Sequence, residues 1–263
     1  MSKQMEVYQF GERLLDTLDL DPVYVILWDS DLDDGEMKRW LVAYWCFYHM
    51  GTASWIASGG IDYWDRMKLA ASSREYLRNR ERRHFRGGLA EKSVAYLSSR
   101  GLDDLFNPLI SDSPKPLTEV MRSVQDWVGF GPWIGFKIAD MLECLQLCPV
   151  VFDSASVFLF DSPRAGAEEM WTRYGKGERP EDVGGWALAG ILAHLGSRVS
   201  PPGGFRDVGV QEAETVLCKW KSYLGGHYTI GEDVEGTRRD LLRYSKTKMS
   251  QRLLKAGERG GLW

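Results

Sequence analysis

The sequence lacks the features that mark several specialised classes of protein. Its 263 residues include only four cysteines (Cys46, Cys144, Cys148 and Cys218), and none of them forms a Cys-x-x-Cys pair. We therefore expect neither a disulfide framework nor a metal centre, and a reducing cytoplasm as the environment. No apolar run approaches the length of a membrane span, and charges interrupt the apolar pattern of the first 15 residues. We accordingly expect neither a membrane association nor a signal peptide.

Acidic residues outnumber basic ones, and the net charge is −4. This charge excludes a generic basic DNA-coating protein. Residues 74–86 (REYLRNRERRHFR) nevertheless hold six arginines against two glutamates. Arg74, Arg78, Arg82 and Arg86 recur every four residues, so a helix would place them in one stripe. The planar guanidinium groups suit bidentate binding of phosphate oxygens, and a solvated basic face is the alternative.

Strand signals are scarce, so the predicted fold is mostly α, a single unit over 1–263. Residues 30–115 and 185–263 are expected to form a flanking helical lobe around 116–160. One buried central helix is expected over 39–58, with Asp33 as its N-cap and Glu36 completing a capping box. Further helices are expected over 5–18, 89–99, 185–195, 210–224 and about 234–256, and a surface excursion over 162–182.

A Gly-x-Gly turn separates two segments of helical period in the stretch Trp127-Val-Gly-Phe-Gly-Pro-Trp-Ile-Gly-Phe-Lys-Ile-Ala-Asp140. Gly129 and Gly131 can adopt positive φ, and Pro132 suits the first turn of the second helix. The free N–H groups at such a helix start bind phosphate well. The stretch therefore predicts a helix, a glycine hairpin and a helix that grip a phosphate.

Asp153 lies 22 residues beyond Gly131 among apolar neighbours. We expect partial burial to raise the pKa of its carboxyl group, which would suit a general base at an extruded nucleotide. An N-cap for residues 154–160 is the alternative role.

The hairpin followed by Phe152-Asp-Ser-Ala155 resembles the helix-hairpin-helix DNA glycosylases. The resemblance implies an all-helical glycosylase-like fold in which Gly129, Phe130, Gly131 and Trp133 contact DNA and Asp153 is catalytic. Family members with lyase activity carry a lysine at the position of Trp133, so Schiff-base chemistry there is excluded. Lys137, one turn further on, is expected to be a surface lysine that touches a DNA phosphate.

Segments spread over 35–235, among them YWCFYHMGTASWI, ERRHFRGG and QEAETVLCKWKSYLGGHYTIG, resemble the bacteriophage α-glutamyl/putrescinyl-thymine pyrophosphorylases, or amino acid:DNA transferases. This resemblance implies that pyrophosphate is displaced from 5-(pyrophosphoryloxymethyl)uracil in double-stranded DNA by the amine of glycine, glutamate or putrescine. It places the protein in the cytoplasm of an infected bacterium. No cofactor is required, although Mg²⁺ could accompany the pyrophosphate.

The residue types suit this reaction. Concentrated positive charge would stabilise the leaving pyrophosphate, and the residues expected to supply it are Arg82, Arg83, His84 and Arg86. Asp153 is the first candidate for the base that deprotonates the amine, and Glu214 the second. Lys219 and Lys221 could hold an amino acid's carboxylate or DNA phosphates; surface ion pairs with Glu214 are the alternative.

Two other functions are compatible with parts of this pattern. A monofunctional glycosylase would use Asp153 to excise a modified pyrimidine, and a non-catalytic module would only bind DNA through the hairpin. Excision alone gives the arginine cluster no pyrophosphate to bind, and DNA gripping alone needs no buried carboxylate. The arginines and Asp153 therefore favour the transferase.

Overall fold

The computed structural model describes residues 5–152 and 160–263 and is almost entirely helical, which confirms the mostly α prediction. None of the helices in these two ranges has the length and apolar character needed to span a bilayer. The chain divides into two compact units. Unit 1 comprises Met1–Pro22 and Val151–Val234, and unit 2 comprises Val23–Val150 and Glu235–Trp263. The expected organisation as a single unit stays a prediction.

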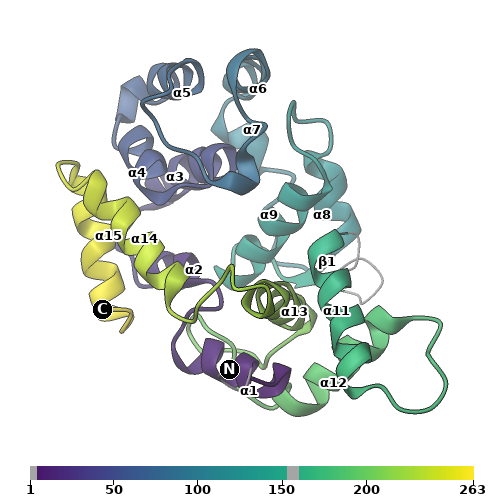
Figure 1. Ribbon diagram of the computed structural model, residues 1–263. Helices are drawn as coiled ribbons and strands as arrows, with labels where there is room; N and C mark the ends of the chain where they lie inside the picture. The colour runs from purple at the N-terminus through teal and green to yellow at the C-terminus, as the bar shows by residue number, and fades with distance from the viewer. Residues whose placement is uncertain (1–4, 153–159) are drawn as a thin grey trace. The chain divides into compact units, whose positions relative to one another are not determined.

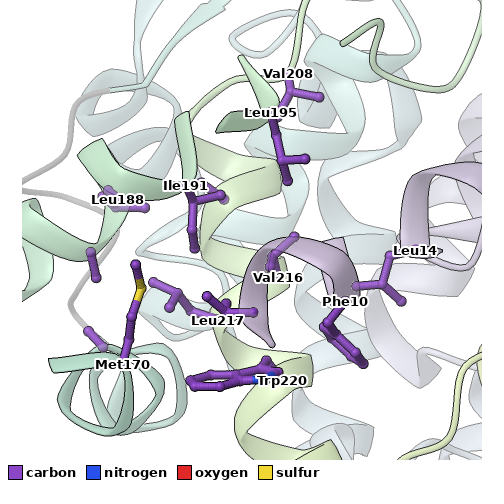
Figure 2. Packing of buried hydrophobic residues seen from close by; sticks show 14 of the residues in the cluster. Phe10, Leu14, Met170, Leu188, Ile191, Leu195, Val208, Val216, Leu217 and Trp220 are labelled. Atoms are coloured by element: carbon purple, nitrogen blue, oxygen red, sulfur yellow. The ribbon is translucent and has the colours of Figure 1, made fainter. Parts of the chain in front are cut away.

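Unit 1 is built on the apolar faces of four helices (Figure 1), which are α1 (Val7–Asp16), α11 (Asp161–Tyr174), α12 (Val183–Leu195) and α13 (Val210–Leu224). Figure 2 shows Val216, Leu217 and Trp220 of α13 directed into this core. Each buried side chain of this size contributes about 1.5–3 kcal/mol relative to an exposed one. Helices α11 and α13 approach closely because Gly166 lies against α13, where an added Cβ would come within 2.4 Å of the Leu217 carbonyl oxygen.

Unit 2 contains the remaining elements, and its helices before the hairpin are α2 (Pro22–Trp28), α3 (Asp34–Phe47), α4 (Met50–Ala57), η1 (Gly60–Asp62), α5 (Tyr63–Ser72), η2 (Arg80–Arg82), α6 (Gly87–Arg100) and α7 (Leu102–Phe106). A short strand β1 (Lys115–Pro116), which pairs with β2 (Val150–Val151), leads into α8 (Leu117–Val124) and α9 (Pro132–Cys144). Helices α14 (Glu232–Arg243) and α15 (Lys248–Arg259) complete the chain.

The expected single helix over 39–58 is wrong, because the chain breaks between α3 and α4. Tyr48 adopts the left-handed conformation at φ 50°, and His49 then caps α4 by accepting a hydrogen bond from the Thr52 amide at 3.2 Å. The predicted capping box is confirmed, since Asp33 and Glu36 each accept the other's backbone N–H.

Three further expectations differ from the structure. Residues 162–182 are not a surface excursion, since α11 occupies most of them. The C-terminal segment forms two helices, α14 and α15. Residues 74–86 form no α-helix, only the 3₁₀ turn η2 inside an irregular segment. Periodic arginines alone gave a false helix signal here because the segment has no apolar face to bury.

Candidate functional site

The predicted glycine hairpin is present between α8 and α9. Gly129 adopts φ +80°, which favours glycine, whereas Gly131 has φ −94° and ψ −176°, so positive φ is wrong for the second glycine. Pro132 occupies the first turn of α9 as expected, and no described side chain caps this helix. The first backbone N–H groups of α9 therefore face outward as hydrogen-bond donors.

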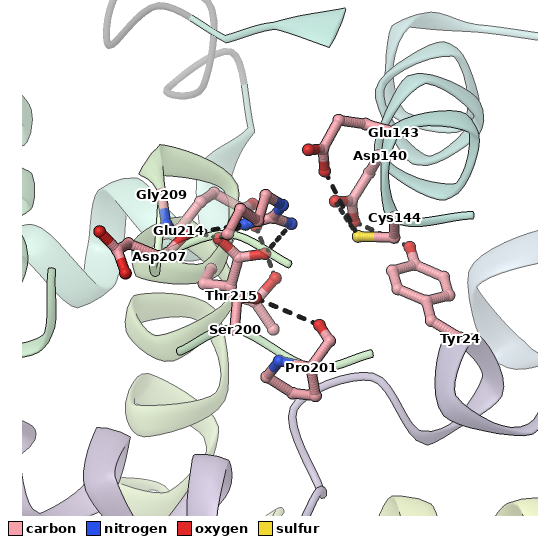
Figure 3. A network of polar contacts seen from close by, with 12 residues as sticks. Tyr24, Asp140, Glu143, Cys144, Ser200, Pro201, Asp207, Gly209, Glu214 and Thr215 are labelled. Carbon is pink, nitrogen blue, oxygen red and sulfur yellow. Dashed lines mark hydrogen bonds and ion pairs between the residues drawn. The ribbon is translucent and has the colours of Figure 1, made fainter. Parts of the chain in front are cut away.

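A buried carboxylate holds the body of α9 in place. Asp140 is almost fully buried and accepts a hydrogen bond from the Tyr24 hydroxyl at 2.8 Å (Figure 3). Lys137 lies 3.5 Å from the same carboxylate, over the Phe136 ring. The expectation of a surface Lys137 is wrong, because the side chain is only 9% exposed. Its contact with a DNA phosphate stays a prediction.

Arg82 joins the arginine-rich segment to the hairpin. Its Nε donates to the Cys46 carbonyl at 3.1 Å, and its Nη1 donates to the Gly129 carbonyl at 3.0 Å. The guanidinium also lies between the rings of Phe85 and Phe130, 4.7 and 5.0 Å from their centroids. Burial lowers the pKa of Arg82, yet an arginine remains protonated in a folded protein. Phe130 is buried in this contact, and its expected contact with DNA stays a prediction.

A pocket of about 240 Å³ lies where this segment meets the start of α9. Gly129 and residues 131–134 line it on the hairpin side, and the arginine-rich segment contributes Glu81, Arg82, His84 and Phe85. The structure thus brings together residues that were predicted from two separate stretches of sequence. Donors at a helix start next to a fixed arginine form a site suited to an oxyanion.

An aromatic surface lies beside the hairpin. The Trp133 ring packs edge-on against Tyr48 with centroids 5.0 Å apart, and Tyr48 packs on Tyr44 at 4.6 Å. Both Trp133 and Tyr48 remain partly exposed. Sequence reasoning missed Tyr48, because its placement depends on the helix break at that residue.

The other arginines of residues 74–86 are distributed differently from the expected stripe. Arg74, Arg78 and Arg86 line a second pocket, of about 700 Å³, with Tyr76 and Gly87 among its other walls. Arg83 is exposed and lines neither of these two pockets.

The candidate residues on α13 belong to unit 1. Glu214 is buried rather than part of an exposed polar stripe, and it accepts a hydrogen bond from the Thr215 hydroxyl at 3.4 Å (Figure 3). Lys219 pairs with Asp233 and donates to the Asp19 carbonyl, whereas Lys221 is exposed. Asp153 lies outside the described residues. The expected roles of all these residues stay predictions.

Asp19 organises the glycine-rich loop that follows α13. Its fully buried carboxylate accepts hydrogen bonds from the Tyr228 hydroxyl, the Gly231 amide at 2.6 Å and the Val234 amide at 2.8 Å. Burial, together with the hydrogen bond and charge of Asp19, raises the pKa of Tyr228. No local sequence signal marks Asp19, because its partners lie more than 200 positions away along the chain.

Comparison with known proteins gives consistent matches. A family model described as "Amino acid:DNA transferase" matches residues 61–228. A glycinyltransferase of Pseudomonas phage PaMx11 is similar to the chain at 35% identity, over 97% of this chain and 96% of the relative. A putrescinyltransferase of Delftia phage PhiW-14 is 25% identical over 90% of this chain and 79% of the relative.

Proposed function

The chain belongs to the amino acid:DNA transferase family, and we propose that it replaces a pyrophosphate group on a modified thymine of double-stranded DNA with the amine of a small molecule. The matches favour a transferase that modifies DNA over a glycosylase that excises a base and over a module that only binds DNA. Glycine, glutamate and putrescine are the candidate amines. The names of the two relatives support the first and the last.

The proposed reaction is a substitution at the exocyclic carbon of 5-(pyrophosphoryloxymethyl)uracil. The C–O bond to pyrophosphate breaks and its electron pair leaves with the phosphate oxygen. The lone pair of the amine forms the new C–N bond, and a base accepts the proton that the nitrogen loses. The glycosidic bond stays intact throughout. Catalysis then requires contacts that hold the DNA, a binding surface for the target nucleobase, stabilisation of the departing anion and a proton acceptor.

The observation that carries this proposal is the pocket shared by the start of α9 and the arginine-rich segment. The outward N–H groups of α9 suit a backbone phosphate next to the target nucleotide. The exposed Arg83 adds positive charge on the same segment, and the His84 ring lines the pocket. The rings of Trp133 and Tyr48 meet edge-on and are both partly exposed, so either ring could stack on an extruded pyrimidine.

The proton acceptor is proposed from the sequence alone. Asp153 follows β2 in the chain and is our first choice, with Glu214 second. Lys221, which is exposed, is the better candidate to hold the carboxylate of an amino acid, because Lys219 already pairs with Asp233. A diphosphate binds Mg²⁺ readily, so Mg²⁺ could accompany this group, and no protein-bound cofactor is proposed.

The test is to incubate the protein with DNA that carries the pyrophosphorylated base and with each amine in turn, followed by nucleoside mass spectrometry. We expect one amine to give an amino-substituted thymine and stoichiometric pyrophosphate. Free base with abasic sites would instead support a glycosylase, and unchanged DNA with every amine would support a binding module.

The role of Asp153 as the proton acceptor is tested separately with the variant Asp153→Asn. We expect turnover to fall at least about 100-fold, the typical contribution of a positioned base, while DNA affinity is retained. Full activity of this variant would remove Asp153 from the mechanism, and Glu214→Gln would then be the next variant to assay.

A further inference from the structure

The pocket lined by Arg74, Arg78 and Arg86 is distinct from the one beside the hairpin. Its volume of about 700 Å³ lies within the range of small-molecule sites. The two pockets share the segment 82–86, because Arg82 and His84 line the hairpin pocket and Arg86 lines this one. Both pockets belong to unit 2. A ligand here would therefore contact a different part of this segment from a ligand at the start of α9.

The pocket is strongly positive and has no acidic wall. Three of its lining residues are arginines and none is a carboxylate. No ion pair joins any of these three arginines to a residue within 5–152 or 160–263. The pKa of Arg78 is lowered, first by burial and then by the positive charge of Arg86. The charges of Arg78 and the exposed Arg86 therefore interact, and no carboxylate lines the pocket that both residues share.

The wall that carries these arginines is fixed although it is not helical. The Thr52 hydroxyl donates to the Leu77 carbonyl at 2.8 Å, and the Asn79 amide donates to the Phe47 carbonyl at 3.1 Å. Arg78 itself donates through Nη2 to the Ala70 carbonyl at 2.7 Å and lies over the Phe47 ring. The Nε of Arg78 is buried and makes no hydrogen bond in the described structure. Arg78 is therefore suited to bind an anion, because its side chain is held in place and one of its N–H donors makes no hydrogen bond.

We propose that the pocket of Arg74, Arg78 and Arg86 receives the pyrophosphate group that the amine displaces. This inference rests on the proposed function. Several guanidinium groups around one pocket match a compact polyanion, which offers many oxygens within a few ångströms. Their charge would stabilise the anion as it develops on the leaving oxygen, which lowers the barrier to C–O cleavage. The DNA backbone itself is the competing occupant.

Direct binding measurements distinguish a pyrophosphate site from a contact with the DNA backbone. The ligand is inorganic pyrophosphate, titrated calorimetrically into wild type, Arg74→Ala, Arg86→Ala and Arg78→Lys. The lysine variant keeps a donor for the Ala70 carbonyl, so that folding is preserved. Arg80→Ala is the matched control, because Arg80 is an exposed arginine of the same segment that lines neither pocket. We expect each pocket variant to weaken pyrophosphate binding about tenfold, as loss of a charged hydrogen bond does, and the control to leave it unchanged.

The same variants are then titrated with duplex DNA at several salt concentrations. We expect DNA affinity and its salt dependence to match wild type. A salt slope lowered by about one in Arg74→Ala would instead identify a DNA phosphate contact and overturn the proposal. Unchanged pyrophosphate affinity in all three pocket variants would also overturn it.

Failure of the site and failure of the proposed function give different results. If the wild type transfers an amine but the pocket variants bind pyrophosphate normally, the proposed pyrophosphate site is wrong and the proposed function stands. If the wild type binds pyrophosphate through these arginines but transfers no amine, the binding site stands and the reaction is wrong.

Discussion

The positively charged side chains of unit 1 and those of residues 74–86 differ in whether carboxylates pair with them. In unit 1, Arg206 forms a two-pronged ion pair with Glu212 at 2.6 and 3.0 Å, and Lys219 pairs with Asp233. Arg198 likewise meets Asp16 at 2.6 Å. In residues 74–86, none of the six arginines pairs with a carboxylate of the described chain. These three cations of unit 1 are held by carboxylates, whereas the arginines of residues 74–86 have no described carboxylate partner.

The difference identifies where an anionic substrate belongs. A guanidinium that already holds a carboxylate can bind phosphate only by breaking an existing contact. Clustered arginines without an acid repel one another, so an anionic ligand gains affinity by relieving that repulsion. Arg82 is the most fully occupied of these arginines, because two backbone carbonyls and two aromatic rings contact it. Arg78 is partly occupied, by the Ala70 carbonyl and the Phe47 ring. Stability measurements on single variants test this difference.

The largest effect is expected at the ion pair of unit 1. Arg206→Ala leaves Glu212, whose side chain is only 5% exposed, with the Gly209 amide as a donor at 2.7 Å but without its cationic partner. Loss of one member of a buried pair typically lowers the free energy of unfolding by about 3–5 kcal/mol. Chemical denaturation measures it, and Arg198→Ala is the control, since its exposed pair with Asp16 is worth at most about 1 kcal/mol. Equal effects of the two variants would remove the structural role assigned to Arg206.

Arg82→Ala should have the next largest effect. It removes two charge-assisted hydrogen bonds to backbone carbonyls and the contacts with Phe85 and Phe130. We expect a loss of about 3 kcal/mol and no measurable turnover, because Gly129 loses its anchor. Arg82→Lys should recover only part of both, since an ammonium cannot reproduce the planar fork. Arg83→Ala is the neighbouring exposed control for stability. If Arg82→Ala were as stable as that control, Arg82 would not brace the hairpin.

Tyr228 should make the stability of the protein decline at high pH. Its pKa is raised in the folded state, so below about pH 10 the hydroxyl is protonated in both states and its full contribution is present. Above pH 10 the unfolded chain releases this proton while the folded chain retains it. The free energy of unfolding then falls by up to about 1.4 kcal/mol per pH unit.

The matched variant is Tyr228→Phe, which leaves Asp19 with its two backbone donors. At pH 7 we expect a loss of about 1–2 kcal/mol, and above pH 10 a shallower decline than in wild type. Denaturation curves from pH 7 to 11 measure both. A decline of the same steepness in this variant would assign the high-pH effect to other groups, such as Cys46, whose pKa burial raises to about 12.

Local patterns predicted the hairpin correctly. The apolar spacing on either side of residues 125–131, Pro132 and the positive φ of Gly129 all follow from interactions a few residues apart. The capping box of Asp33 and Glu36 was predictable for the same reason. These features are encoded within one or two helical turns.

The arginine pockets were not predictable in this way. The four-residue spacing of Arg74, Arg78, Arg82 and Arg86 suggested a helix, but hydrogen bonds to residues 25 or more positions earlier hold the segment in another path. Tertiary contacts therefore override the local pattern. Surface ion pairs were the alternative role for Glu214, yet the fold buries its side chain. The partners that decide burial lie far away in sequence.

The smallest effect on stability is expected at Arg74 and Arg86. Neither makes an ion pair with a described residue, so Arg74→Ala and Arg86→Ala should change the free energy of unfolding by less than about 0.5 kcal/mol. Relief of repulsion with Arg78 should make the small change in Arg86→Ala stabilising. Added pyrophosphate should raise the unfolding temperature of wild type and Arg80→Ala, and raise it less in the two pocket variants, because a ligand stabilises the state that binds it. A loss of several kcal/mol in Arg74→Ala without ligand would show that this arginine is used as unit 1 uses Arg206, and the contrast between the two regions would no longer hold.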